Sequence, residues 1–184
     1  MAVDSLISLL LLSAILLLFA ASVFHKLTAV QHFFAVVADY QLAPDALSRP
    51  LGFALIISEL SVLILALSGR VQWALVLAVV LLAIYSIGIS MNLVRGRRDI
   101  DCGCAGPAAT QTLSEWLVVR NATLLLVALA ALIPANNRAL TFPDWVTLAA
   151  GLGAMCGLYT AANTLIANHL QLTSDRENRL WKTR

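Results

Sequence analysis

Two cysteines one residue apart are the side chains of this sequence best suited to chemistry. Cys102 and Cys104 lie in a polar segment between long apolar stretches, and a glycine separates them. Thiols at this spacing can close a small disulfide, bind a soft metal or exchange electrons with a partner thiol. The glycine permits the tight backbone of such a bridge, which we expect to be strained and easily reduced. The alternative interpretation is a pair of incidental thiols in a loop.

Charged residues just before the pair bear on its reactivity. Arg95, Arg97 and Arg98 favour the thiolate form, so they are expected to lower the pKa of the cysteines. Two aspartates in the same segment, Asp99 and Asp101, act in the opposite direction. A closed zinc site needs four ligands, and the segment contains no histidine, so it lacks the ligands for such a site.

The third cysteine lies in the last apolar stretch. A free cysteine such as Cys156 usually packs as a small apolar side chain within a membrane helix. Gly153 and Gly157 flank it at the small-xxx-small spacing that is typical of close helix contacts. We therefore expect structural packing at Cys156, and a role as a third thiol in a relay is the alternative.

One acidic residue falls near the middle of an apolar stretch. Glu59 lies within residues 51–67, where a charge is costly and normally faces the bundle interior and a partner. Arg120 could supply that partner or extend towards the arginine-rich end, and His25 and Lys26 are further candidates. The sequence favours equally a structural Glu59–Arg120 pair and a Glu59 that handles protons or a quinone.

The composition of the chain is that of an integral membrane protein. Of its 184 residues, 60% are hydrophobic and 12% are charged, against about 25% charged in ordinary soluble domains. Isolated apolar segments must be helical in lipid, because a lone strand leaves its backbone groups unpaired. The basic residues lie beside the apolar stretches, as membrane flanks do, and indicate lipid rather than nucleic acid as a partner. The predicted fold is an all-α polytopic transmembrane bundle.

Five apolar stretches are close to the bilayer-spanning length of about 20 residues. Only three residues separate the second stretch from the third, so these two form an antiparallel hairpin. The first is interpreted as a retained helix rather than a signal peptide, because no Lys or Arg precedes it and it is unusually long. The five spans are residues 6–24, 51–67, 71–94, 116–133 and 145–167.

The remaining segments complete a single domain over residues 1–170 and a polar tail over 171–184. Apolar residues at helical spacing after the first span predict an interfacial amphipathic helix or a continuation of that span. Asp144 is a candidate N-cap for the last helix.

Basic residues predict the orientation in the membrane. With five spans, one face collects far more basic residues than the other. The positive-inside rule then puts the N-terminus outside and the Cys102 loop in the cytoplasm, with the chain in a bacterial inner membrane. Disulfide formation, by contrast, is typical of the periplasm, so the two indications conflict. The face with more basic residues has Lys26, Arg49, Arg95, Arg97, Arg98, Arg176, Arg179, Lys182 and Arg184, and the opposite face has Arg70 and Arg138.

Five short motifs follow one another between about residues 20 and 135. They occupy residues 24–27, 34–44, 58–60, 102–106 and 119–121. In order and spacing, the chain resembles the MauE branch of the MauE/DoxX-like redox-associated membrane proteins. The resemblance implies a small helical bundle that takes part in thiol–disulfide chemistry. In methylamine metabolism this family is associated with maturing a disulfide-rich partner, alongside a thioredoxin-like protein.

The resemblance also assigns residues to roles. Carried over by position, Cys102 and Cys104 are the redox pair, and Glu59, Lys26 and Arg120 match further family positions. The first hypothesis is therefore a thiol–disulfide oxidoreductase, for which a quinone near Glu59 is the candidate cofactor. The first alternative is a non-catalytic accessory subunit of a larger respiratory or dehydrogenase assembly. The second is a thiolate relay for a soft metal, with Cys156 as a further station.

Overall fold

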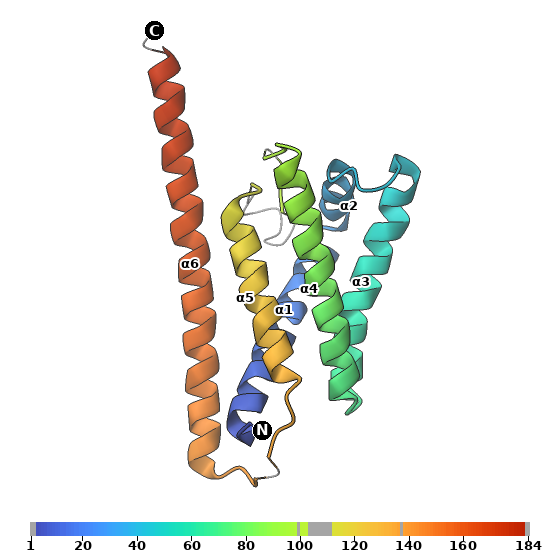
Figure 1. The fold of residues 1–184 in the computed structure, drawn as a ribbon, viewed down its shortest axis with the longest axis vertical. Coiled ribbons are helices and arrows are strands. Elements are labelled where there is room, and N and C mark those ends of the chain that lie inside the picture. Colours follow the sequence, from blue (N-terminus) through green and yellow to red (C-terminus); the bar gives the residue numbers. More distant parts are fainter. Residues whose placement is uncertain (1–2, 99, 103–111, 137, 183–184) are drawn as a thin grey trace. The chain divides into compact units, whose positions relative to one another are not determined.

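Residues 3–98, 100–102, 112–136 and 138–182 are described by a computed structural model of the chain. The described residues form six helices and two compact units, residues 1–139 and 140–184 (Figure 1). The first unit contains α1 (Ser5–Thr28), α2 (Val30–Asp39), α3 (Asp45–Leu67), α4 (Val71–Val94) and α5 (Glu115–Ala131), and the second contains α6 (Phe142–Lys182).

The predicted all-α membrane fold is confirmed. Among the described residues, α1, α3, α4 and α6 are long and apolar enough to cross a membrane. The remaining expected span corresponds to α5, whose 17 residues extend over about 25 Å. Since the hydrocarbon core of a bilayer is about 30 Å thick, a crossing by α5 stays a prediction.

The helices of the first unit pack as an antiparallel bundle. α3 and α4 form the expected hairpin, in which Gly69 adopts a φ of +78° that favours glycine. α4 also packs against α5, and α1 lies against both α3 and α5 (Figure 1). Apolar side chains on the outer faces remain exposed, as expected for helices that contact lipid. The buried centre of the bundle consists of Ile15, Phe19, Val62, Ala74, Leu75, Ala78, Leu81, Leu82, Ala128 and Ala131.

The helix expected after the first span is present as α2. It is separate from α1, because Ala29 has φ −135° and ψ 50° and so leaves the helical conformation. Its apolar face, including Phe33 and Phe34, is buried against α3. A Cβ at Gly52 of α3 would lie 2.6 Å from Cδ1 of Phe34, so this close approach requires glycine.

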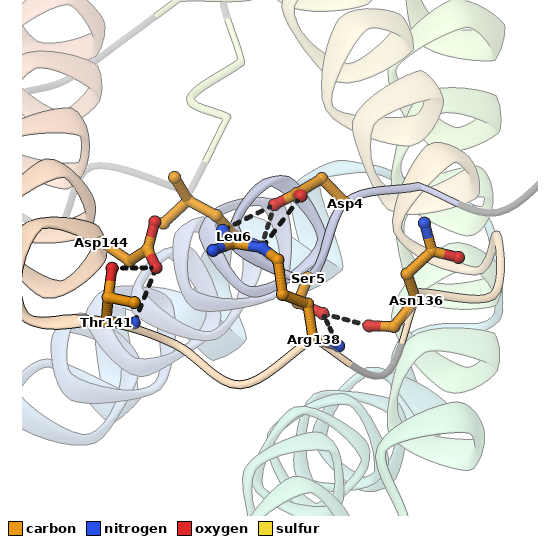
Figure 2. A network of polar contacts seen from close by, with 7 residues as sticks. All are labelled: Asp4, Ser5, Leu6, Asn136, Arg138, Thr141 and Asp144. Atoms are coloured by element: carbon orange, nitrogen blue, oxygen red, sulfur yellow. Dashed lines mark hydrogen bonds and ion pairs between the residues drawn. The ribbon is translucent and has the colours of Figure 1, made fainter.

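Polar contacts fix the start of α1. Asp4 caps the helix by accepting a hydrogen bond from the Leu6 backbone N–H at 2.8 Å (Figure 2). Nε of Arg138 donates to the same carboxylate at 3.3 Å, and the Val3 N–H donates to the Pro134 carbonyl at 3.0 Å. The N-terminal residues are therefore tied to the segment that follows α5.

The second unit is the single helix α6. Because α6 begins at Phe142, Thr141 occupies the cap position, and the prediction of Asp144 as N-cap is wrong by three residues. The Thr141 backbone N–H and hydroxyl both donate to Asp144 Oδ2, at 2.7 and 2.8 Å (Figure 2). The expected polar tail continues the helix to Lys182. Cys156 is exposed, so the packing expected for it is not observed among the described residues.

Candidate functional site

A buried ion pair joins α1 to α3. Nζ of Lys26 lies 2.5 Å from Oε1 of Glu59, and the two side chains are 5% and 1% exposed. Tyr85 of α4 donates its hydroxyl to the same carboxylate oxygen at 2.7 Å. Ser22 of α1 donates to Oε1 and Oε2 at 3.2 and 3.3 Å. We call Ser22, Lys26, Glu59 and Tyr85 the carboxylate network.

Aromatic rings complete the surroundings of the buried ammonium group. Nζ of Lys26 lies 4.8 Å from the ring centroids of both Phe33 and Tyr85, and it donates to the Tyr85 hydroxyl at 3.0 Å. Ring faces attract a cation, and the carboxylate of Glu59 receives three donors. Buried charges are tolerated only when such additional bonds satisfy them. The carboxylate network therefore joins three helices of the bundle.

The expected Glu59–Arg120 pair is wrong. The partner is Lys26, which the sequence named as a further candidate, because α1 continues past the predicted end of the first span. Lys26 is thus a helical residue four positions after Ser22, on the same face of α1. Sequence reasoning did not single out Ser22 or Tyr85. Tyr85 could have been found from the sequence, because a tyrosine within an apolar stretch carries a hydroxyl that needs a partner.

Cys102 is buried against the N-terminal end of α5. It is 7% exposed and packs with Ile89, Ile100, Leu113 and Leu117. Nη2 of Arg120, itself in a residue that is 8% exposed, donates to Cys102 Sγ at 3.7 Å. We call Cys102 and Arg120 the thiol site. A guanidinium group beside sulfur favours the thiolate, which is the nucleophilic form of cysteine.

Backbone pairing and a histidine hold the segment that carries Cys102. The Leu113 N–H donates to the Ile100 carbonyl at 3.0 Å, and Asp101 pairs with Thr112 in an isolated antiparallel bridge. Nε2 of His32, on α2, lies 3.3 Å from Oδ2 of Asp101. Cys102 is thereby fixed between α2 and α5.

The second cysteine of the motif cannot be placed beside the first. Cys104 lies outside the described residues, which end at Cys102 on this side of the segment and resume at Thr112. The disulfide between Cys102 and Cys104 stays a prediction.

Two arginines expected to act on the cysteines bind elsewhere. Nη2 of Arg98 lies 2.5 Å from Oε1 of Glu115, and both side chains are exposed. This hydrogen bond and the charge of Arg98 lower the pKa of Glu115, and the same contact raises the pKa of Arg98. Nη1 of Arg97 donates to Oδ1 of Asn92 at 3.5 Å. The arginine that the structure brings to the sulfur of Cys102 comes instead from α5.

The first turns of α5 also carry buried donors without a partner. Asn121 is 4% exposed, and its Nδ2 has no hydrogen-bond partner among the described residues. The same holds for Nε1 of Trp116, a residue that the sequence did not single out. Buried polar groups are nearly always paired, so each of these atoms calls for an explanation.

Comparisons with known proteins agree on one family. The sequence profile described as Methylamine utilisation protein MauE matches residues 4–134, a range that contains the carboxylate network and the thiol site. The chain is 35% identical over 152 residues to Methylamine utilization protein MauE of Paracoccus denitrificans, covering 81% of each chain. It is 35% identical over 151 residues to the Methylorubrum extorquens protein of that name, covering 80% of this chain and 81% of the relative. No solved structure matches the chain.

Proposed function

The chain belongs to the MauE family of multi-pass membrane proteins, and from this premise we propose that it is a thiol–disulfide redox protein of methylamine utilisation. Its redox pair is Cys102 with Cys104, and its partner is a protein that carries a dithiol or a disulfide. A thioredoxin-like protein, alone or within a larger redox complex, has the chemistry that such a partner requires.

The contact between Arg120 and Cys102 carries this proposal. A guanidinium group and a thiol lie 3.7 Å apart, and both residues are more than nine-tenths buried. A cation at this position stabilises negative charge on the sulfur, which activates the cysteine for exchange. Cys156, by contrast, is exposed on α6 and lies outside the range that the family profile matches.

The proposed reaction balances without a further reagent. The Cys102 thiolate attacks a disulfide of the partner, which forms a mixed disulfide and releases one partner thiol. The Cys104 thiol then displaces the second partner sulfur, which closes the Cys102–Cys104 disulfide. Two electrons and two protons pass to the partner, and the reverse sequence oxidises it. Either direction supports maturation of a disulfide-bearing protein.

The distribution of arginines supports a cytoplasmic position for the thiol site. In the first unit, the chain passes up α1, down α3, up α4 and down α5, so Cys102 shares one end of the bundle with α2 (Figure 1). More arginines flank this end than the other, which the positive-inside rule associates with the cytoplasmic face of an inner membrane. The first end has Arg49, Arg95, Arg97 and Arg98, and the opposite end has Arg70 and Arg138.

Cysteine labelling tests the redox pair and its side of the membrane together. In a Cys156→Ser variant, a membrane-impermeant maleimide is added to intact cells and to inverted vesicles, with and without prior reduction. We expect mass shifts only after reduction, and only in inverted vesicles. In the matched variant that also carries Cys102→Ser, the remaining Cys104 should react without reduction.

The opposite pattern favours the alternative functions. If both cysteines react at once without reduction, the pair has no resting disulfide. If, in addition, alkylation leaves methylamine-dependent growth unchanged, the chain is an accessory subunit of a larger assembly rather than a redox protein.

A further inference from the structure

A histidine on α2 contacts the segment that carries the proposed nucleophile. Nε2 of His32 lies 3.3 Å from Oδ2 of Asp101, and the two side chains are 36% and 14% exposed. A carboxylate only accepts hydrogen bonds, so Nε2 is the donor in this contact. Asp101 directly precedes Cys102 in the chain. The contact between α2 and this segment therefore lies one residue away from the reactive sulfur.

The segment around Asp101 is extended, which separates neighbouring side chains onto two faces. Asp101 pairs with Thr112 in an antiparallel bridge, and the Leu113 N–H donates to the Ile100 carbonyl at 3.0 Å. In an extended chain, successive side chains point to opposite faces. Ile100 and Cys102 are 8% and 7% exposed and pack in one apolar cluster with the start of α5. The side chain of Asp101, between them, is directed to the other face, where α2 lies.

The helix α2 is a firm support for this contact. Phe33 directly follows His32, and its ring centroid lies 4.8 Å from Nζ of Lys26 in the carboxylate network. Phe33 and Phe34 are buried in one cluster with Ile56 of α3. The imidazole therefore extends from a helix whose neighbouring residues are fixed within the bundle.

The reactivity of the thiol site depends on where the segment lies. Nη2 of Arg120 is 3.7 Å from Cys102 Sγ, and the attraction between a cation and a thiolate weakens as their distance grows. The backbone bridge restrains the segment on the side of α5, and the imidazole restrains it on the side of α2. Without the second restraint, the segment can turn about the bridge and draw the sulfur away from the guanidinium group.

We propose that His32 is a positioning residue of the thiol site, which holds Asp101 from α2 and so keeps the Cys102 sulfur beside Arg120. The inference rests on the proposed function, in which the Cys102 thiolate is the nucleophile. His32 acts through the position of Asp101 rather than through a charge of its own. Another N–H donor in place of the imidazole should therefore preserve the effect.

Alkylation kinetics of the full-length protein in lipid nanodiscs test this role. The parent protein carries Cys104→Ser and Cys156→Ser, so that Cys102 is the remaining thiol. Its rate constant with iodoacetamide is measured at about pH 7 and at about pH 10, where an ordinary cysteine is also a thiolate. His32→Leu removes the hydrogen bond, whereas His32→Gln keeps an N–H donor in place of Nε2.

We expect His32→Leu to lower the rate at neutral pH about threefold, because the sulfur loses part of its contact with Arg120. At about pH 10 the rate should be no lower than that of the parent, since the thiolate then forms without the help of a cation. His32→Gln should restore most of the rate at neutral pH. His25→Leu is the matched control and should react like the parent, because the ring of His25 packs against Phe24.

A second background separates position from charge. Asp101→Ala removes the group through which His32 acts, so His32→Leu should have no further effect on the rate in an Asp101→Ala protein. If the imidazole instead acted on the sulfur by its own charge, its removal would slow alkylation in that background as well.

Three results overturn the positioning role. The first is an unchanged rate in His32→Leu at neutral pH while Arg120→Gln lowers it, in which case the proposed function stands. The second is an equal loss at both pH values, and the third is an effect of His32→Leu that persists in Asp101→Ala. If Arg120→Gln also reacts at the rate of the parent, the activation of Cys102 on which the proposed function depends fails together with the positioning role.

Discussion

The carboxylate network and the thiol site are both buried in the first unit, and they differ in how their polar groups are satisfied. Around Glu59, each charged or hydroxyl group shown has a partner, and two aromatic rings flank the ammonium group of Lys26. Around Cys102, a cation faces a sulfur, and two nearby donors have no partner among the described residues. A buried ion pair is tolerated when further hydrogen bonds satisfy it, whereas a buried donor without a partner calls for an explanation.

The helix α2 contacts both regions through adjacent residues. The ring of Phe33 lies over the ammonium group of Lys26, and His32 contacts Asp101, the residue before Cys102. The close packing of α2 on α3 at Gly52 therefore bears on the two regions together.

The largest expected effect comes from breaking the buried ion pair. Glu59→Leu leaves the Lys26 ammonium group buried without a carboxylate, so we expect a loss of about 3–5 kcal/mol in the free energy of unfolding. The double variant Lys26→Met, Glu59→Leu removes both charges and should recover most of that loss. Denaturant unfolding in detergent micelles measures both. A single variant as stable as the wild type would show that the network does not hold the helices together.

Replacing Gly52 should disturb both regions through α2. Gly52→Ala places a Cβ 2.6 Å from Cδ1 of Phe34, so the ring or the helix that carries it must shift. We expect a loss of about 1–3 kcal/mol, the usual cost of overpacking. Gly153→Ala is the matched control, because a Cβ there meets nothing within 4 Å. Equal unfolding midpoints for the two variants would contradict the tight α2–α3 contact.

Removing the cation from the thiol site should slow the chemistry of Cys102. In a Cys104→Ser, Cys156→Ser background, Arg120→Gln should lower the rate of Cys102 alkylation on the order of tenfold at neutral pH, because less thiolate is present. Arg98→Gln is the control, since Arg98 binds Glu115 instead. Iodoacetamide kinetics over a range of pH measure the effect. Equal rates of Cys102 alkylation in Arg120→Gln and Arg98→Gln would show that Arg120 does not activate the Cys102 sulfur.

The exposed pair Arg98–Glu115 should give the smallest effect. Because Arg98 lowers the pKa of Glu115, the pair adds stability above the ordinary pKa of a glutamate. That contribution is lost as the pH falls through the lowered pKa. Arg98→Gln should therefore reduce the melting temperature slightly at neutral pH and not at all in strong acid. If Arg98→Gln lowers the melting temperature more in acid than at neutral pH, the pair does not stabilise the protein in this way.

The sequence predicted the helices better than the contacts between them. Apolar length and the short connection at Gly69 gave the spans and the α3–α4 hairpin, because both depend on neighbouring residues. The partner of Glu59 was mistaken because it depends on whether α1 ends at Phe24 or includes Lys26. A helix boundary is the least certain feature of a local pattern.

By itself, the sequence determined that this protein is a helical membrane protein with a cysteine pair beside arginines, because composition and spacing are local properties. It could not decide which arginine reaches the sulfur. Three lie within seven residues of Cys102, yet the contact comes from Arg120, 18 residues away on α5. Only the packing of α5 against the end of α4 brings that side chain to the thiol. The tertiary structure likewise decided that Lys26, Glu59 and Tyr85, from three different helices, share one buried network.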